Sequence, residues 1–82
     1  MHTEEELFEQ LKKIIVEKLK VEDPAKVTKE ARFREDLNAD SLDTYDLVYS
    51  IEEEMEITIP AEKATDFEKV GDALAFIVSQ KN

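Results

Sequence analysis

The sequence Asp36-Leu37-Asn38-Ala39-Asp40-Ser41-Leu42-Asp43 sets a serine among carboxylates at the expected start of a helix. Asp40 has the side chain of a good N-cap, which places Ser41 at the first helical position and Asp43 in the first turn. The helix dipole and the first-turn amides favour an anion at such an end, although Asp40 and Asp43 would repel one. The stretch therefore predicts both a helix boundary and a polar site.

The net charge of the protein is concentrated around this stretch. The chain of 82 residues has a formal charge of −10. Residues 1–34 contain eight acids and eight bases, residues 63–82 contain three of each, and residues 35–62 contain ten acids and no base. A field of one sign confined to one segment indicates an interaction site. It also disfavours nucleic acid as a partner, because phosphates would be repelled.

Hydrophobic periodicity predicts an all-α protein. Apolar residues recur at three- and four-residue spacing from Leu7 to Leu19, which predicts an amphipathic helix over about residues 3–20, capped by Thr3. Further helices are expected over about residues 41 to 54 or 55, 61–65 after a proline, and 70–80. We therefore expect one domain spanning residues 1–82, a small bundle of three main helices and one short helix.

The connection over residues 21–40 is long, and its length argues against a wholly irregular loop. Pro24 stops any helix, and we expect Thr28 to cap a single turn. Apolar residues can hold the segment against the core, and they are Val27, Ala31, Phe33 and Leu37.

Several classes of function are disfavoured by the residue types present. The chain has no cysteine, so disulfides, thiolate metal sites and a cysteine nucleophile are excluded. A catalytic Ser41 would need a general base, but the only histidine, His2, stands beside the N-terminus, where we expect a solvated side chain. The only glycine is Gly71, so a Gly-x-Ser-x-Gly elbow is absent. We therefore do not expect an enzyme.

The spacing Asp36-x-Asn38-x-Asp40 is similar to the opening of a calcium-binding EF-hand loop. The similarity then fails, because the sixth position is Ser41 in place of glycine and the twelfth is Leu47 in place of glutamate. No metal site is predicted, although weak binding of divalent cations by the clustered carboxylates stays open.

The same stretch and its flanks resemble the acyl carrier proteins of bacterial type II fatty-acid synthesis. The resemblance rests on Asp40-Ser41-Leu42 after Asp36-Leu37-x-Ala39, on Asp43-Thr44, Asp46 and Glu52-Glu53-Glu54, and it extends through Ile59-Pro60 and Val70. In that family the serine carries a 4′-phosphopantetheine arm, taken from coenzyme A, whose thiol holds acyl groups as thioesters. The resemblance implies this covalent cofactor on Ser41 and the role of a carrier of growing acyl chains.

The outer face of the second predicted helix differs from an ordinary solvated face. At about 100° per residue its aliphatic residues gather on the core side, whereas Leu42, Tyr45 and Tyr49 fall on the opposite side among carboxylates. Isolated exposed apolar residues are normal. These three lie within two turns of Ser41, which favours a docking surface of apolar anchors and steering carboxylates. The predicted partner-binding residues are Asp40, Leu42, Asp43, Tyr45, Asp46, Tyr49, Glu52 and Glu53.

The resemblance also implies the partners, which are a phosphopantetheinyl transferase and fatty-acid synthesis enzymes with basic docking patches. Two alternatives stay open: a related carrier for polyketide, peptide or D-alanyl transfer, and an acidic helical adaptor that is never modified. We expect a cytoplasmic monomer, because the N-terminus lacks the regions of a signal peptide and no apolar run approaches membrane-spanning length.

Two positions depart from the family pattern. Asn38 stands where glycine is common, and asparagine tolerates the left-handed conformation that such a turn requires. Tyr49 replaces a small or unbranched aliphatic residue, which leaves partner specificity open. The small residues Ser50, Ala64 and Ala73 match positions that line the space entered by an acyl chain in this family. The sequence equally allows that they only let the helices approach closely.

Overall fold

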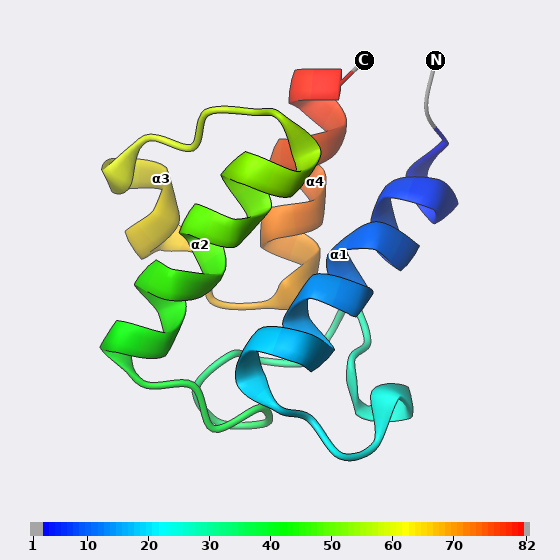
Figure 1. Cartoon of the computed structure of the whole chain (residues 1–82), viewed down its shortest axis with the longest axis vertical. Helices are drawn as coiled ribbons and strands as arrows, with labels where there is room; N and C mark the ends of the chain where they lie inside the picture. Colours follow the sequence, from blue (N-terminus) through cyan, green and yellow to red (C-terminus); the bar gives the residue numbers. More distant parts are fainter. Residues whose placement is uncertain (1–2, 82) are drawn as a thin grey trace.

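The computed structural model describes residues 3–81, with the side chain of Ser41 left undescribed, and His2 lies outside the described residues. Over this range the chain forms α1 (Glu4–Leu19), the 3-10 turn η1 (Pro24–Lys26), α2 (Ser41–Met55), α3 (Ala61–Asp66) and α4 (Val70–Lys81). Helices α1, α2 and α4 form the body of the bundle, and the short α3 lies to one side of it (Figure 1). The predicted all-α architecture and the helix boundaries are confirmed to within a residue.

Helix α1 forms where its caps and periodicity predict it. The Thr3 hydroxyl accepts a hydrogen bond from the N–H of Glu6 at 3.1 Å, which satisfies one of the free amides of the first turn. Lys20 ends the helix in the left-handed conformation, with φ of 53°. The buried stripe Leu7, Leu11, Ile14 and Ile15 packs against α2 and α4.

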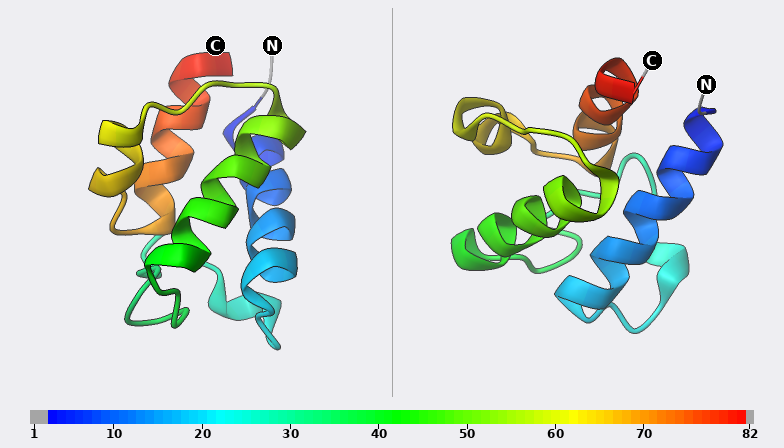
Figure 2. Two further views of the ribbon diagram at one scale, coloured as in Figure 1. Left: turned by 60° about the vertical axis from the view of Figure 1, so that its left-hand side comes forward. Right: turned by 45° about the horizontal axis from the view of Figure 1, so that its top comes forward.

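One core unites the helices and the long connection. Figure 2 shows the connection running beneath the ends of the three long helices. Its four predicted anchors are all buried, as expected: Val27, Ala31, Phe33 and Leu37. The helical turn lies earlier than predicted, at Pro24–Lys26, where the carboxylate of Asp23 accepts from the N–H of Ala25 at 3.0 Å. Proline is well suited to such a first position because its missing N–H is not needed there. At Thr28 a non-helical turn is closed by the N–H of Ala31, which donates to the Thr28 carbonyl at 3.1 Å.

The start of α4 is joined to this connection by backbone hydrogen bonds. The N–H of Val70 donates to the carbonyl of Ala31, and the N–H of Gly71 donates to the carbonyl of Lys29, both at 2.9 Å. A Cβ atom at Gly71 would lie 2.9 Å from that Lys29 oxygen. The only glycine of the chain therefore stands where two backbone segments approach too closely for a side chain.

The segment between α2 and α3 forms a loop, in which residues 57–59 alternate in polarity over too short a run for a strand. Ile59 is buried and holds the loop against the core. Among the described helices, none is both long and apolar enough to cross a membrane.

Candidate functional site

The first turn of α2 is fixed by a reciprocal capping box. The N–H of Asp43 donates to Oδ1 of Asp40 at 2.9 Å, and the N–H of Asp40 donates to Oδ2 of Asp43 at 3.3 Å. The Thr44 hydroxyl donates to the carbonyl of Asp40 at 3.0 Å. Ser41 is the first residue of the helix, as predicted.

The chain enters this helix through a tight turn. Asn38 adopts a φ of 56°, the left-handed conformation expected for the residue that replaces glycine in this turn. Leu37 and Ala39, on either side, are buried, so the turn is fixed to the core. Asp36 accepts a hydrogen bond from the N–H of Arg32 at 2.8 Å. This bond, assisted by the charge of Arg32, lowers the pKa of the Asp36 carboxyl below its usual value.

The three large apolar residues predicted for the outer face of α2 are exposed. Leu42 is 78% exposed, Tyr45 57% and Tyr49 59%. Asp43, Asp46 and Glu53 are exposed beside them. The Glu53 carboxylate raises the pKa of the Tyr49 phenol, first through a hydrogen bond and then through its charge. The structure thus places apolar and acidic side chains together on one accessible face.

Glu52 differs from the other predicted partner-binding residues. Its Oε2 atom accepts a hydrogen bond from the backbone N–H of Ile59 at 3.0 Å, and the side chain is partly buried. Glu52 therefore joins the last turns of α2 to the following loop. This contact could not be predicted from the sequence, because no spacing rule predicts a bond to an amide in an irregular loop.

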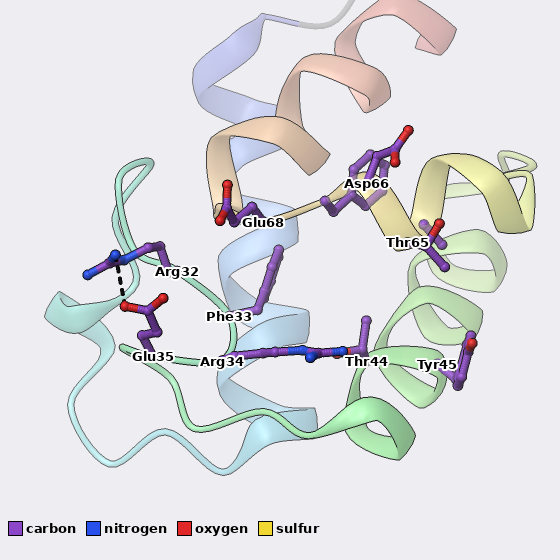
Figure 3. A pocket seen from close by; sticks show the side chains of 11 residues that line it. Arg32, Phe33, Arg34, Glu35, Thr44, Tyr45, Thr65, Asp66 and Glu68 are labelled. Atoms are coloured by element: carbon purple, nitrogen blue, oxygen red, sulfur yellow. Dashed lines mark ion pairs between the residues drawn. The ribbon is translucent and has the colours of Figure 1, made fainter.

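A groove of about 480 Å³ opens between the start of α2, helix α3 and the connection (Figure 3). Thr44 and Tyr45 form the α2 wall, and Figure 3 shows the Arg34 side chain pointing toward Thr44. Arg32 pairs with Glu35 at 2.8 Å at the outer edge of the groove. The remaining lining residues are Phe33, Ala64, Thr65, Asp66, Phe67 and Glu68. Of the residues that line the groove, only Tyr45 and Ala64 were candidate site residues from the sequence.

The three small residues considered as cargo-lining positions lie in two different environments. Ala64 lines the groove. Ser50 and Ala73 do not line it and are packed in the core, where they are 7% and 1% exposed. In this conformation Ser50 and Ala73 act as close-packing residues between helices.

In the described part of the chain, no group of three or more histidine, cysteine or acidic residues is placed to hold a metal ion. The carboxylates of Asp40 and Asp43 at the start of α2 instead accept hydrogen bonds from backbone N–H groups.

Comparison with known proteins identifies the family. Residues 9–77, which include all of α2, match the family described as "Phosphopantetheine attachment site". The acyl carrier protein of Treponema pallidum is 58% identical over 76 residues, covering 93% of this chain and 96% of its own. That of Treponema denticola is 53% identical over 77 residues, covering 94% and 97%. The chain belongs to the acyl carrier protein family.

A solved structure agrees with this assignment. The acyl carrier protein from Enterococcus faecalis is 34% identical and superposes with a TM-score of 0.78, covering 96% of this chain and 99% of that one. The predicted family, fold class and 4′-phosphopantetheine cofactor are therefore confirmed. The role of such a protein is to carry acyl groups rather than to catalyse, and acyl chains and the enzymes of their synthesis are its partners.

The residues around the groove are suited to the arm. From its attachment point, 4′-phosphopantetheine consists of a phosphodiester, an apolar dimethyl group, a hydroxyl, two amides and a terminal thiol. The groove offers two arginines, threonine hydroxyls and aromatic side chains beside the first turn of α2, and its acids are Glu35, Asp66 and Glu68. The arginines, hydroxyls and apolar surface fit the phosphate, the polar groups and the apolar part of the arm.

Proposed function

We propose that Ser41 is the residue that bears the 4′-phosphopantetheine arm, and that the protein carries growing acyl chains on it for fatty-acid synthesis. The observation that carries the assignment is the position of Ser41. It is the first residue of α2, directly after the reciprocally capped Asp40, within the Asp-Ser-Leu motif and inside the range that matches the family. A rigid helix end holds the attachment residue in one place for every enzyme that must reach it.

When bound, the arm supplies the thiol that forms the thioester, which the chain cannot supply because it has no cysteine. The protein's own residues determine where the arm is presented. Asp40 and Asp43 fix the first turn of α2, and Asn38 sets the direction of entry into it. Presentation of the arm, rather than bond-making, is thus the task of this part of the fold.

The outer face of α2 is the proposed surface for partner enzymes. Leu42, Tyr45 and Tyr49 provide apolar anchors close to Ser41, and the carboxylates around them attract enzymes that carry basic patches. Charge steering accelerates encounter more than it strengthens the final complex. A carrier that must leave each enzyme after a single step benefits from that combination.

Intact mass tests the attachment site. The protein is incubated with coenzyme A and a broad-specificity phosphopantetheinyl transferase, beside the variant Ser41→Ala. We expect the wild type to gain one phosphopantetheine and the variant to gain none. A folded, initially unmodified wild type that gains no mass would favour the unmodified acidic adaptor. The thioester cargo isolated with the protein separates fatty-acid synthesis from polyketide, peptide or D-alanyl transfer.

Charge reversal tests the docking surface. Asp46→Lys and Glu53→Lys should each slow modification by the transferase by about tenfold at low salt, with little change in unfolding. The matched control is Glu17→Lys on α1, an exposed residue whose reversal changes the net charge equally. Equal slowing by the control would show that net charge, and not this face, governs the encounter.

A further inference from the structure

The side chains of two arginines extend in different directions at the groove (Figure 3). Arg32 and Arg34 are the two basic residues among those that line the groove. Arg32 is engaged by Glu35 at 2.8 Å and by Asp36 at 3.5 Å. Arg34 extends along the groove, and its guanidinium points toward Thr44 of α2 (Figure 3).

The place to which Arg34 points is one helical turn from the attachment residue. Thr44 follows Ser41 by three positions in α2, and residues with this spacing are neighbours on a helix surface, with Cβ atoms about 5–6 Å apart. A phosphodiester is bonded directly to the attachment residue, so it lies close to the start of α2 whatever course the rest of the arm takes.

The side chains around that position are mostly acidic, so a bound anion requires a nearby cation. Residues 35–62 contain ten acids and no base, and Arg34 immediately precedes them. Asp40 and Asp43 flank the attachment residue, and Asp66 and Glu68 line the groove on the side of α3 and the turn into α4. An added phosphodiester brings a further negative charge into this acidic surface, which is unfavourable unless a cation is in reach.

We propose that Arg34 binds the phosphodiester of the arm and holds the first part of the arm at the mouth of the groove. The planar guanidinium presents paired N–H donors that match two phosphate oxygens, which a lysine ammonium cannot reproduce. The aromatic and hydroxyl lining of the groove then receives the part of the arm beyond the phosphate. This inference rests on the proposed attachment to Ser41.

The test compares four proteins: the unmodified and modified forms of the wild type and of Arg34→Gln. Modification is first verified by intact mass, and the unfolding equilibrium of each protein is measured in urea at low salt. We expect modification to lower the unfolding constant of the wild type by about two- to fivefold more than that of Arg34→Gln, the range for a solvent-exposed charge pair. Taking the difference between modified and unmodified forms removes any effect of the substitution on the unmodified fold.

Two further variants make the comparison specific. Arg32→Gln also removes a groove arginine, but we expect it to change the modified and unmodified proteins equally. Arg34→Lys keeps the positive charge but lacks the planar guanidinium. We expect modification to lower the unfolding constant of this variant by less than that of the wild type and by more than that of Arg34→Gln. The Nε–Hε signal of Arg34 in nuclear magnetic resonance provides a readout that does not depend on stability, and it should shift when the wild type is modified.

The outcomes separate the two proposals. A wild type that gains no mass would overturn the attachment site and this inference together. The role of Arg34 alone would be overturned if the wild type gains the arm, its unfolding constant changes on modification as much as that of Arg34→Gln, and the Arg34 signal does not shift. If Arg34→Gln fails to fold, the presence or absence of the signal shift in the wild type decides the question.

Discussion

Helices α1 and α2 are nearly equal in length, with 16 and 15 residues, and they pack against each other, yet their outer faces differ. Residues 1–34, which include α1, contain as many bases as acids, whereas the segment that includes α2 contains acids alone. The large exposed apolar residues of the described chain all lie on α2. The inner faces therefore build the same core, and the outer face of α2 is the part left for recognition.

The charged residues of the two regions also make different contacts. Near α1, Glu4 pairs with Lys29 at 2.6 Å, and the Lys29 ammonium lies 5.8 Å from the centre of the Phe8 ring. In α2 the carboxylates of Asp40, Asp43 and Glu52 accept hydrogen bonds from backbone amides. Some acids of α2 thus maintain the fold, while others are exposed to solvent, and substitutions can tell the two groups apart.

The largest expected difference is between an inner and an outer leucine. Leu11 of α1 is fully buried, so Leu11→Ala should lower the free energy of unfolding by about 2–5 kcal/mol. Leu42→Ala on the exposed face of α2 should change it by less than about 0.5 kcal/mol and should slow modification by the transferase. Urea unfolding and modification rates measure both effects. A large loss of stability in Leu42→Ala would contradict the division into two faces.

The next effect concerns the close approach at the start of α4. Gly71→Ala should destabilise the protein by about 1–3 kcal/mol, because the added Cβ meets the Lys29 carbonyl oxygen, which belongs to the backbone. Alanine would otherwise favour the helix by about 1 kcal/mol, so the sign of the change is informative. Ala75→Gly, at an exposed position of the same helix, measures that propensity alone. A stabilised Gly71→Ala would show that the connection can move away from α4.

Substitutions in the capping box should have a smaller effect on the free energy of unfolding. They distinguish the role of Asp40 as a helix cap from the role of its charge. Asp40→Ala should cost about 1 kcal/mol in unfolding free energy, because the N–H of Asp43 loses its acceptor. Asp40→Asn keeps an acceptor at that position and should retain most of the stability while removing one negative charge. If Asp40→Asn is as slow in modification as Asp40→Ala, the charge of this residue, rather than its cap, matters to the transferase.

The smallest effect distinguishes two adjacent glutamates of α2. Glu52→Ala should lower the unfolding free energy by about 1 kcal/mol, because the N–H of Ile59 loses its partner. Glu53→Ala should change it by less than about 0.5 kcal/mol. The docking effects should run in the opposite order, with Glu53 the more important for modification rate. Thermal or urea unfolding of the pair, measured beside their modification rates, checks the division.

Most of the helical framework could be predicted because its causes are local. Thr3 and Asp40 cap the helices that follow them, and a periodic apolar stripe identified each long helix. Asn38 was expected to adopt the left-handed conformation for a steric reason, and it does. The helical turn was expected after Thr28 and lies after Asp23, because both residues are suitable caps and only the path of the chain selected Asp23.

The sequence by itself determined the helices, the acidic segment and the motif around Ser41, since each depends on residues that are neighbours along the chain. Tertiary structure decided the close approach of Gly71 to Lys29, the bond from Ile59 to Glu52 and the direction of Arg34 along the groove. These contacts join an irregular loop or connection to a helix. A loop lacks the regular repeat from which side-chain direction can be inferred, so its contacts are set only when the whole core has packed.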